Sequence, residues 1–255
     1  MTDLPPLPTI GAVSRRPPPG GTRKEWVQAT LVALRDETPR MRTYRLRLPQ
    51  PLLQVPGQHV TVRLTAPDGY TATRSYSIAS APGQGDPAGT EIELMVEQLD
   101  GGEVSGYLHD ELRVGDQLEV RGPFGGWFVW NGRSPALLVG GGSGVVPLMS
   151  MLRHRRVTGS SVPLRLVVSV RSPDELPFAD EYGAETTVVY SRRAPTGSAR
   201  PAGRLTADDL APLLVPDGTA YVCGSSGFAE HASQLLVDLG VPAASIRVER
   251  YGPTS

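Results

Sequence analysis

The feature that most restricts the fold of this 255-residue chain is a change of pattern around residues 131–135. Before it, short apolar or alternating runs are separated by turn signals, at residues 26–34, 43–48, 59–64, 73–80, 91–98 and 117–121. Beyond it, short β-branched and apolar runs alternate with helical patterns, at residues 136–139, 164–169, 186–191, 219–223 and 245–250. One of these helical patterns begins at Thr206-x-x-Asp209. The first pattern is typical of a small antiparallel β-barrel and the second of a doubly wound parallel α/β sheet. We therefore expect two domains, at residues 25–131 and 132–255.

Charge and composition restrict the partners and the location. The formal net charge is −1, so the chain offers neither a basic nucleic-acid stripe nor a polyacidic surface. No window approaches the roughly 18 apolar residues of a membrane helix. Residues 1–24, rich in Pro, Gly and Arg, predict a disordered tail or a basic docking arm, and Pro17 follows Arg15-Arg16 where an export signal needs an apolar segment. We expect a soluble, cytoplasmic monomer with no nucleic-acid or membrane partner.

Cysteine and histidine usage argues against metal chemistry. Cys223 is the only cysteine, which excludes an internal disulfide and a cysteine-ligated iron–sulfur cluster, since the latter needs about four thiolates. The histidines show no metal-ligand spacing; they are His59, His109, His154 and His231. Neither glycine–serine run completes the Gly-x-Ser-x-Gly pattern of a hydrolase. We therefore expect no bound metal and no hydrolase.

The first candidate site is the run Arg74-Ser75-Tyr76-Ser77 in the expected strand 73–80. Alternate side chains of a strand share a face, so Arg74 and Tyr76 are expected to project one way and the two serines the other. The arginine fork suits a phosphate, and a tyrosine ring can lie flat on a conjugated ring system. An ordinary amphipathic strand with an exposed arginine would show the same pattern.

A second candidate phosphate site begins the one helix expected in this half, at residues 105–112. Gly102-Glu103-Val104-Ser105 leads into it, so backbone N–H groups and a hydroxyl gather at a helix start. Such a terminus attracts phosphate without side-chain charge. The alternative interpretation is a plain N-cap by Ser105.

A glycine-rich turn joins the strand at 136–139 to an expected helix at 145–154. It reads Gly140-Gly141-Gly142-Ser143-Gly144-Val145-Val146-Pro147. Glycines between a strand and a helix are typical of a phosphate-binding loop, although Pro147 stands where the full dinucleotide fingerprint has its third glycine. Proline in a first helical turn costs little, because its missing N–H has no helical partner there. We expect Gly142, Ser143 and Gly144 to bind a dinucleotide.

Arginines follow the strands of the second domain, where ligands bind in parallel sheets. Arg171 and Ser172 follow one strand, Arg192 follows the next, and Arg204 comes after it. NAD sites usually carry an acid near the end of the second strand, whereas arginine accommodates the 2′-phosphate of NADP. This pattern predicts NADP rather than NAD. Solvated loop arginines are the alternative, and Asp174 or Glu175 could still turn inward.

Together these motifs resemble the ferredoxin-NADP reductase family over residues 25–251. The resemblance assigns the barrel to FAD, bound by Arg74, Ser75, Tyr76, Ser77, Gly102, Val104, Ser105 and Tyr251. It assigns the α/β domain to NADP, bound by Gly142, Ser143, Gly144, Arg171, Ser172, Arg192, Arg204, Cys223 and Gly224. Cys223 opens Cys-Gly-Ser-Ser-Gly where the family has Cys-Gly-Pro, and a lone cysteine is otherwise a packing residue. Four residues follow Tyr251, unlike the terminal aromatic residue of relatives.

The mechanism that the resemblance implies is hydride transfer from NADPH to the flavin, followed by release of single electrons to a separate ferredoxin or oxygenase component. Ser77, Cys223 and Glu249 are the catalytic residues it implies, and Tyr76 would stack on the flavin. Two alternatives stay open: a flavin reductase that releases its flavin, and a non-catalytic FAD-bearing relay subunit. The sequence does not identify the acceptor.

Overall fold

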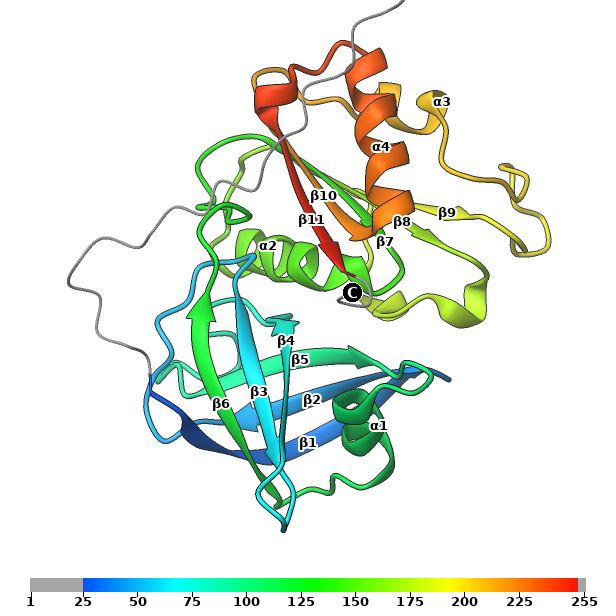
Figure 1. The fold of residues 1–255 in the computed structure, drawn as a ribbon. Coiled ribbons are helices and arrows are strands. Elements are labelled where there is room, and N and C mark those ends of the chain that lie inside the picture. The colour runs from blue at the N-terminus through cyan, green and yellow to red at the C-terminus, as the bar shows by residue number, and fades with distance from the viewer. Residues whose placement is uncertain (1–24, 252–255) are drawn as a thin grey trace, which may run out of the picture.

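Two sheets organise the part of the chain that the computed structural model describes, residues 25–251 (Figure 1). The expected tail at residues 1–24 lies outside the described residues. Strands before residue 125 form the first sheet and strands from residue 136 onward form the second. The expected fold class, an antiparallel barrel followed by a parallel α/β domain, is confirmed. The exact division at residue 131 stays a proposal.

The first sheet is antiparallel and has six strands in the order β4-β3-β6-β1-β2-β5. They are β1 (Val27–Thr38), β2 (Met41–Arg47), β3 (His59–Thr65), β4 (Thr71–Ser77), β5 (Glu91–Glu97) and β6 (Gln117–Phe124). A bridge between Ile78, just past β4, and Leu94 on β5 brings the two edges together. The alternation read from residues 91–98 places Ile92, Leu94 and Val96 in the barrel core, each at most 2% exposed. Period-two patterning therefore decides which face of each strand is buried.

One helix, α1 (Glu103–Asp110), packs on the end of the barrel. Val104 and Leu108 enter the barrel core, and the Tyr44 hydroxyl donates a 2.9 Å hydrogen bond to the Leu108 carbonyl. The helix begins two residues earlier than expected, with Gly102 rather than Ser105 at the N-cap. The alternative interpretation, a plain N-cap by Ser105, is wrong, because Val104 is buried in the barrel core and the first helical turn already includes it.

The second sheet is parallel, in the order β11-β10-β7-β8-β9. Its strands are β7 (Ala136–Gly141), β8 (Leu164–Val170), β9 (Thr186–Tyr190), β10 (Thr219–Ser225) and β11 (Ile246–Tyr251). Its helices are α2 (Val145–Val157), α3 (Ala207–Leu210) and α4 (Ser226–Asp238). On β7, Leu138 packs with α2 whereas Leu137 and Val139 pack with α3 and α4, so helices cover both faces. The capping box of Thr206 and Asp209 that begins α3 matches the start read from the sequence.

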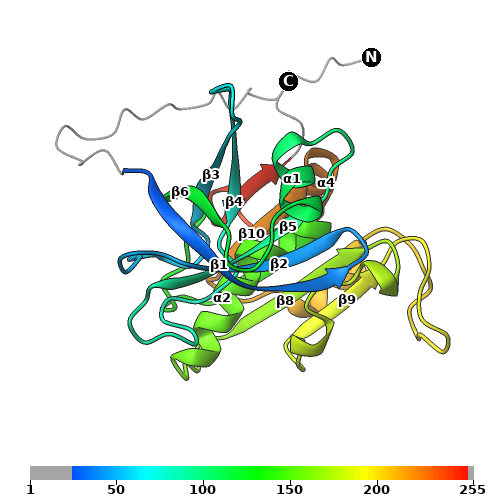
Figure 2. The same cartoon turned by 90° about the horizontal axis from the view of Figure 1, so that it is seen from below.

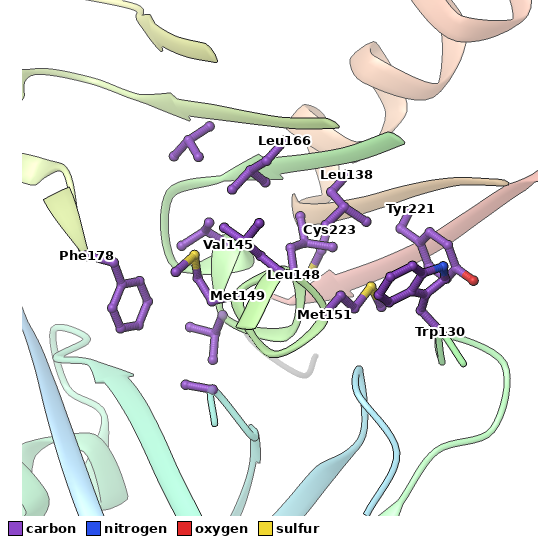
Figure 3. Packing of buried hydrophobic residues seen from close by; sticks show 14 of the residues in the cluster. Trp130, Leu138, Val145, Leu148, Met149, Met151, Leu166, Phe178, Tyr221 and Cys223 are labelled. Atoms are coloured by element: carbon purple, nitrogen blue, oxygen red, sulfur yellow. The ribbon is translucent and has the colours of Figure 1, made fainter. Parts of the chain in front are cut away.

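Helix α2 lies between the parallel sheet and the barrel (Figure 1). Seen from the barrel side, the barrel strands lie in front of it (Figure 2). Figure 3 shows Leu138 and Leu166 of the sheet packed with Val145, Leu148 and Met149 of this helix. Met41, Ala79 and Met95 of the barrel belong to the same cluster. One apolar core thus spans both sheets and fixes their relative position. No helix within residues 25–251 has the length and apolarity to cross a membrane.

Candidate functional site

A cleft of about 440 Å³ lies where the barrel faces the carboxyl ends of β7, β10 and β11. The barrel contributes β4, the end of β5 and the start of α1, and the α/β domain contributes the glycine turn, Cys223 and the end of β11. Strand β11 runs toward the barrel (Figure 1), and its last residues line the cleft. Twelve of the residues predicted from the sequence line the cleft: Arg74, Ser75, Tyr76, Ser77, Gly102, Val104, Ser105, Ser143, Gly144, Cys223, Glu249 and Tyr251.

The barrel wall of the cleft is the run Arg74–Ser77. Arg74 is exposed, and its Nη1 donates to the Thr73 carbonyl at 2.8 Å, so most of its donor fork is available to a ligand. Tyr76 packs against the barrel core with its ring half-buried. Burial raises the pKa of the Tyr76 hydroxyl well above its ordinary value, and the adjacent Arg74 only partly opposes this shift. The tyrosine is therefore a neutral aromatic surface at any physiological pH.

The start of α1 forms the floor next to Arg74. The Ser105 hydroxyl, only 5% exposed as a residue, accepts from the Leu99 N–H at 3.2 Å and donates to the Gly102 carbonyl at 3.3 Å. A Cβ on Gly102 would come within 2.4 Å of that hydroxyl, so this turn requires glycine. The Ser105 hydroxyl thus stabilises the turn through hydrogen bonds within it. The backbone N–H groups of the first helical turn have no acceptor within the helix, so they are the donors suited to a phosphate.

The glycine turn forms the opposite wall. Strand β7 ends at Gly141, residues Gly142–Gly144 make a 3-10 turn, and α2 begins at Val145 with Pro147 in its first turn. A Cβ on Gly144 would lie 2.3 Å from the Cys223 carbonyl oxygen. Gly142 has φ of 56°, a conformation that other residues adopt only with strain. The run of glycines therefore lets this turn pack directly on β10 beside the cleft.

Two hydroxyls tie this turn to its surroundings. The Ser143 hydroxyl donates to Glu97 Oε2 at 2.7 Å, which links the turn to the end of β5 in the barrel. The Tyr251 hydroxyl donates to the Gly141 carbonyl at 2.6 Å, and burial raises its pKa to about 12. Glu97 was not identified from the sequence. Its position at the end of the expected strand 91–98, a few residues before the Gly101-Gly102 turn, was the only available signal.

Cys223 and Glu249 lie opposite each other on the parallel strands β10 and β11. Cys223 is 4% exposed, and burial, reinforced by the Glu249 carboxylate, raises the pKa of its thiol. Burial also raises the pKa of Glu249, whose Oε2 is buried and has no hydrogen-bond partner among residues 25–251. The pair is therefore a neutral thiol next to a carboxyl group that lacks a donor.

The remaining predicted residues lie outside the cleft lining. The N–H groups of Arg192 and Arg193 donate to the Arg171 carbonyl at 2.9 and 3.0 Å, and Gly203 N–H donates to the Tyr190 carbonyl at 3.0 Å. The loops that carry Arg171, Ser172, Arg192 and Arg204 therefore come together at the end of β9. Glu175 lies 3.8 Å from Arg171, and Asp174 pairs with Arg193. Gly142 lies under the Tyr251 hydroxyl, and Gly224 packs on Phe228.

The cleft residues fit a flavin and a nicotinamide nucleotide. Arg74 and the first turn of α1 offer phosphate donors on one side of a half-buried aromatic surface, Tyr76. The Glu249 Oε2 atom, which has no hydrogen-bond partner within the described part of the chain, can accept from a donor such as an amide N–H. The glycine turn places backbone where a side chain would fill the space.

Comparison with known proteins agrees with this geometry. Residues 28–129 match the family model of the oxidoreductase FAD-binding domain. The ferredoxin–NAD(P)(+) reductase component of a naphthalene 1,2-dioxygenase/salicylate 5-hydroxylase system from Ralstonia is 30% identical, over 89% of this chain and 70% of its own length. The glycine betaine monooxygenase reductase subunit of Chromohalobacter salexigens is 32% identical, over 86% and 62%. The chain thus spans about two thirds of the length of these two relatives.

Solved structures agree as well. The FAD/NAD-binding domain of nitric oxide dioxygenase from Vibrio cholerae superposes with a TM-score of 0.78 at 25% identity, over 89% of this chain and 99% of that domain. The ferredoxin reductase in carbazole 1,9a-dioxygenase has the same fold, with a TM-score of 0.75 at 21% identity, over 91% and 70%. The fold and cleft define an FAD- and NAD(P)-dependent flavoprotein oxidoreductase. The chain belongs to the ferredoxin–NADP reductase-like family, as its motifs predict.

Proposed function

We propose that the protein catalyses hydride transfer from NADPH to bound FAD. Electrons then pass singly to a separate redox protein, a ferredoxin or an oxygenase component. The observation that carries this proposal is one cleft with the Arg74–Ser77 run on one wall and Cys223 with Glu249 on the other. The relatives from Ralstonia and Chromohalobacter salexigens are reductase parts of oxygenase systems by name, which supports a separate acceptor.

The barrel residues bind and orient the flavin in this proposal. Arg74 and the α1 N-terminus hold its phosphates, Tyr76 stacks on its ring system, and the half-buried Ser77 hydroxyl hydrogen-bonds near the reacting edge. A bound flavin would supply the redox chemistry that amino-acid side chains lack, since a flavin can accept a two-electron hydride and release electrons singly. The protein's contribution is position and electrostatics.

The α/β residues receive the nicotinamide. Ser143, Cys223 and Glu249 line its approach, Cys223 being buried and the other two half-buried, which limits the access of water to the path of the hydride. The raised pKa of the Cys223 thiol keeps it protonated, so it contributes packing and a weak donor rather than a nucleophile. Glu249 provides the acceptor for a carboxamide N–H.

We further propose that the coenzyme is NADPH rather than NADH. Arg171, Ser172, Arg192 and Arg204 sit on loops that come together at the end of β9. The two acids nearby, Asp174 and Glu175, are each close to an arginine, which leaves no unpaired carboxylate among them for a ribose 2′-hydroxyl. The monomeric state expected from the sequence also stays a prediction.

Anaerobic reduction tests the proposal. The purified protein, passed through gel filtration, should remain yellow, and NADPH should bleach its flavin absorbance. Adding ferricyanide, a one-electron acceptor, should then restore the absorbance at two equivalents per flavin. Loss of all flavin on the column would favour the flavin-reductase alternative. Retained flavin that dithionite but not NADPH or NADH reduces would favour the relay subunit instead.

A further inference from the structure

The hydrogen bond between Ser143 and Glu97 crosses the cleft from one domain to the other. Glu97 ends β5 of the barrel, and Ser143 lies in the 3-10 turn before α2. The Ser143 Oγ to Glu97 Oε2 distance is 2.7 Å, and both residues line the cleft. None of the assignments made from the motifs gives Glu97 a role.

The direction of this bond determines what Ser143 can offer a ligand. A carboxylate has no hydrogen to give, so the hydroxyl must donate, and its proton is committed to Glu97. Ser143 Oγ then presents only lone pairs to the cleft. The unpartnered Glu249 Oε2 is a second acceptor at the same wall. These two acceptors match the N–H donors of a carboxamide group rather than its carbonyl oxygen.

Glu97 also brings a charge that no cation among residues 25–251 neutralises through an ion pair. Within residues 25–251 its carboxylate accepts one hydrogen bond, from the Ser143 hydroxyl. It faces the Tyr251 hydroxyl, whose pKa its charge helps to raise. The other charged side chains that line the cleft are Arg74, Arg250, Asp100 and Glu249. A half-buried carboxylate attracts a cation more strongly than an exposed one, because less water screens it.

We propose that Glu97 is a positioning residue for the nicotinamide, an inference that rests on the function proposed above. It fixes Ser143 as an acceptor for the carboxamide amino group. Its charge favours the cationic oxidised nicotinamide ring over a neutral ring. Glu97 thereby acts on coenzyme binding through Ser143 and through space.

Ligand binding to the oxidised, FAD-loaded protein tests both parts without turnover. Three ligands are titrated against the flavin absorbance: NADP⁺, its 3-acetylpyridine analogue, which lacks the amino donor, and tetrahydro-NADPH, whose ring is neutral. The variants are Glu97→Gln, Glu97→Asp and Ser143→Ala. Glu91→Gln is the matched control, because Glu91 lies on the same strand but pairs with Arg47 and does not line the cleft.

Glu97→Gln should weaken NADP⁺ at least fivefold and tetrahydro-NADPH less than twofold. The unmodified protein should prefer NADP⁺ to the acetylpyridine analogue at least fivefold, and Ser143→Ala, which removes the acceptor, should lose most of that preference. Glu97→Asp, which keeps the charge, should recover the discrimination between charged and neutral rings. Glu91→Gln should change none of these ratios.

Equal weakening of all three ligands by Glu97→Gln would overturn the inference, since that result means a purely structural role. Unchanged affinities would overturn it too. If Glu97→Gln releases its FAD or fails to fold, Glu97→Asp decides the matter, and the inference fails if that variant binds all three ligands without discriminating between them. An unmodified protein that binds FAD but none of the three ligands defeats the proposed function itself. If the unmodified protein binds the three ligands and the Glu97 variants bind them with the same affinities, only the role of Glu97 is defeated.

Discussion

Arg153 of α2 reaches out of the parallel-sheet domain to Glu93 on β5 of the barrel, with Nη1 2.6 Å from Oε1. The same guanidinium donates to the Ala79 carbonyl at 3.0 Å and, through Nε, to Glu181 at 2.8 Å. Arg153 is 4% exposed. Its charge is therefore compensated from both domains at once, and the two domains are fixed to each other through one side chain.

Replacement of Arg153 should reveal that coupling. Arg153→Met removes the buried cation that joins the Glu93 and Glu181 carboxylates and leaves Glu181 only the more distant Arg35, so we expect the free energy of unfolding to fall by about 3–5 kcal/mol. Urea denaturation of the FAD-loaded protein measures it. Arg156→Met is the control on the same helix, because its ion pair with Glu185 is more exposed and should matter by about 1 kcal/mol or less. Similar losses in the two variants would contradict the assignment.

The buried Glu249 predicts a dependence of stability on pH. Burial raises its pKa in the folded protein above the ordinary value of 4.5. Its contribution is thus fully present below about pH 4.5 and is lost as the pH rises through the raised value. Glu249→Gln removes the titration, so its thermal midpoint relative to the unmodified protein should be higher at pH 8 than at pH 4. Glu91→Gln is the control, and a midpoint difference that does not change with pH would contradict the prediction.

Arg74→Ala should weaken FAD binding in particular. A charge-assisted hydrogen bond contributes roughly 1.5–3 kcal/mol, which is about ten- to a hundredfold in the dissociation constant. Flavin fluorescence titration of apoprotein measures the constant. Arg45→Ala, at an exposed position on β2, should leave it unchanged. An unchanged constant for Arg74→Ala would make Arg74 an ordinary surface residue.

Cys223→Ser should slow the reduction of flavin by NADPH more than it weakens FAD binding. The thiol lies at the glycine turn, where a Cβ on Gly144 would touch the Cys223 carbonyl, and it borders the proposed nicotinamide approach. Stopped-flow reduction and FAD titration provide the two measurements. Reduction at the unmodified rate would show that Cys223 serves only to pack the core.

Coenzyme choice should depend on the arginines beyond the strand ends. We expect NADPH to exceed NADH at least tenfold in kcat/KM, because one arginine–phosphate contact contributes roughly 1.5–3 kcal/mol. Paired replacement of Arg171 and Arg192 by Ala should remove most of that preference and leave NADH turnover nearly unchanged. Arg165→Ala, at an exposed position on β8, is the control. Equal efficiencies with both coenzymes in the unmodified protein would mean that these arginines are solvated.

The sequence alone determined the elements that depend on near neighbours. The alternation at Ile92, Leu94 and Val96 gave a barrel strand with the correct inner face, and Thr206 with Asp209 gave a helix start. The motifs read from the sequence gave twelve of the residues that line the cleft. Such signals are readable because period, capping and turn chemistry act over a few residues.

Only the tertiary structure decided the partners of polar side chains. Ser143 meets Glu97 across 46 residues, and Arg153 meets Glu93 across 60, so no local pattern connects them. Helix α1 also begins at Glu103 rather than at the expected residue 105, because Val104 is buried in the barrel core. The local sequence around a charged or hydroxyl side chain is compatible with many different hydrogen-bond partners. The side chain's bond is chosen only when packing of the apolar core brings one partner within reach and removes the water that would otherwise compete.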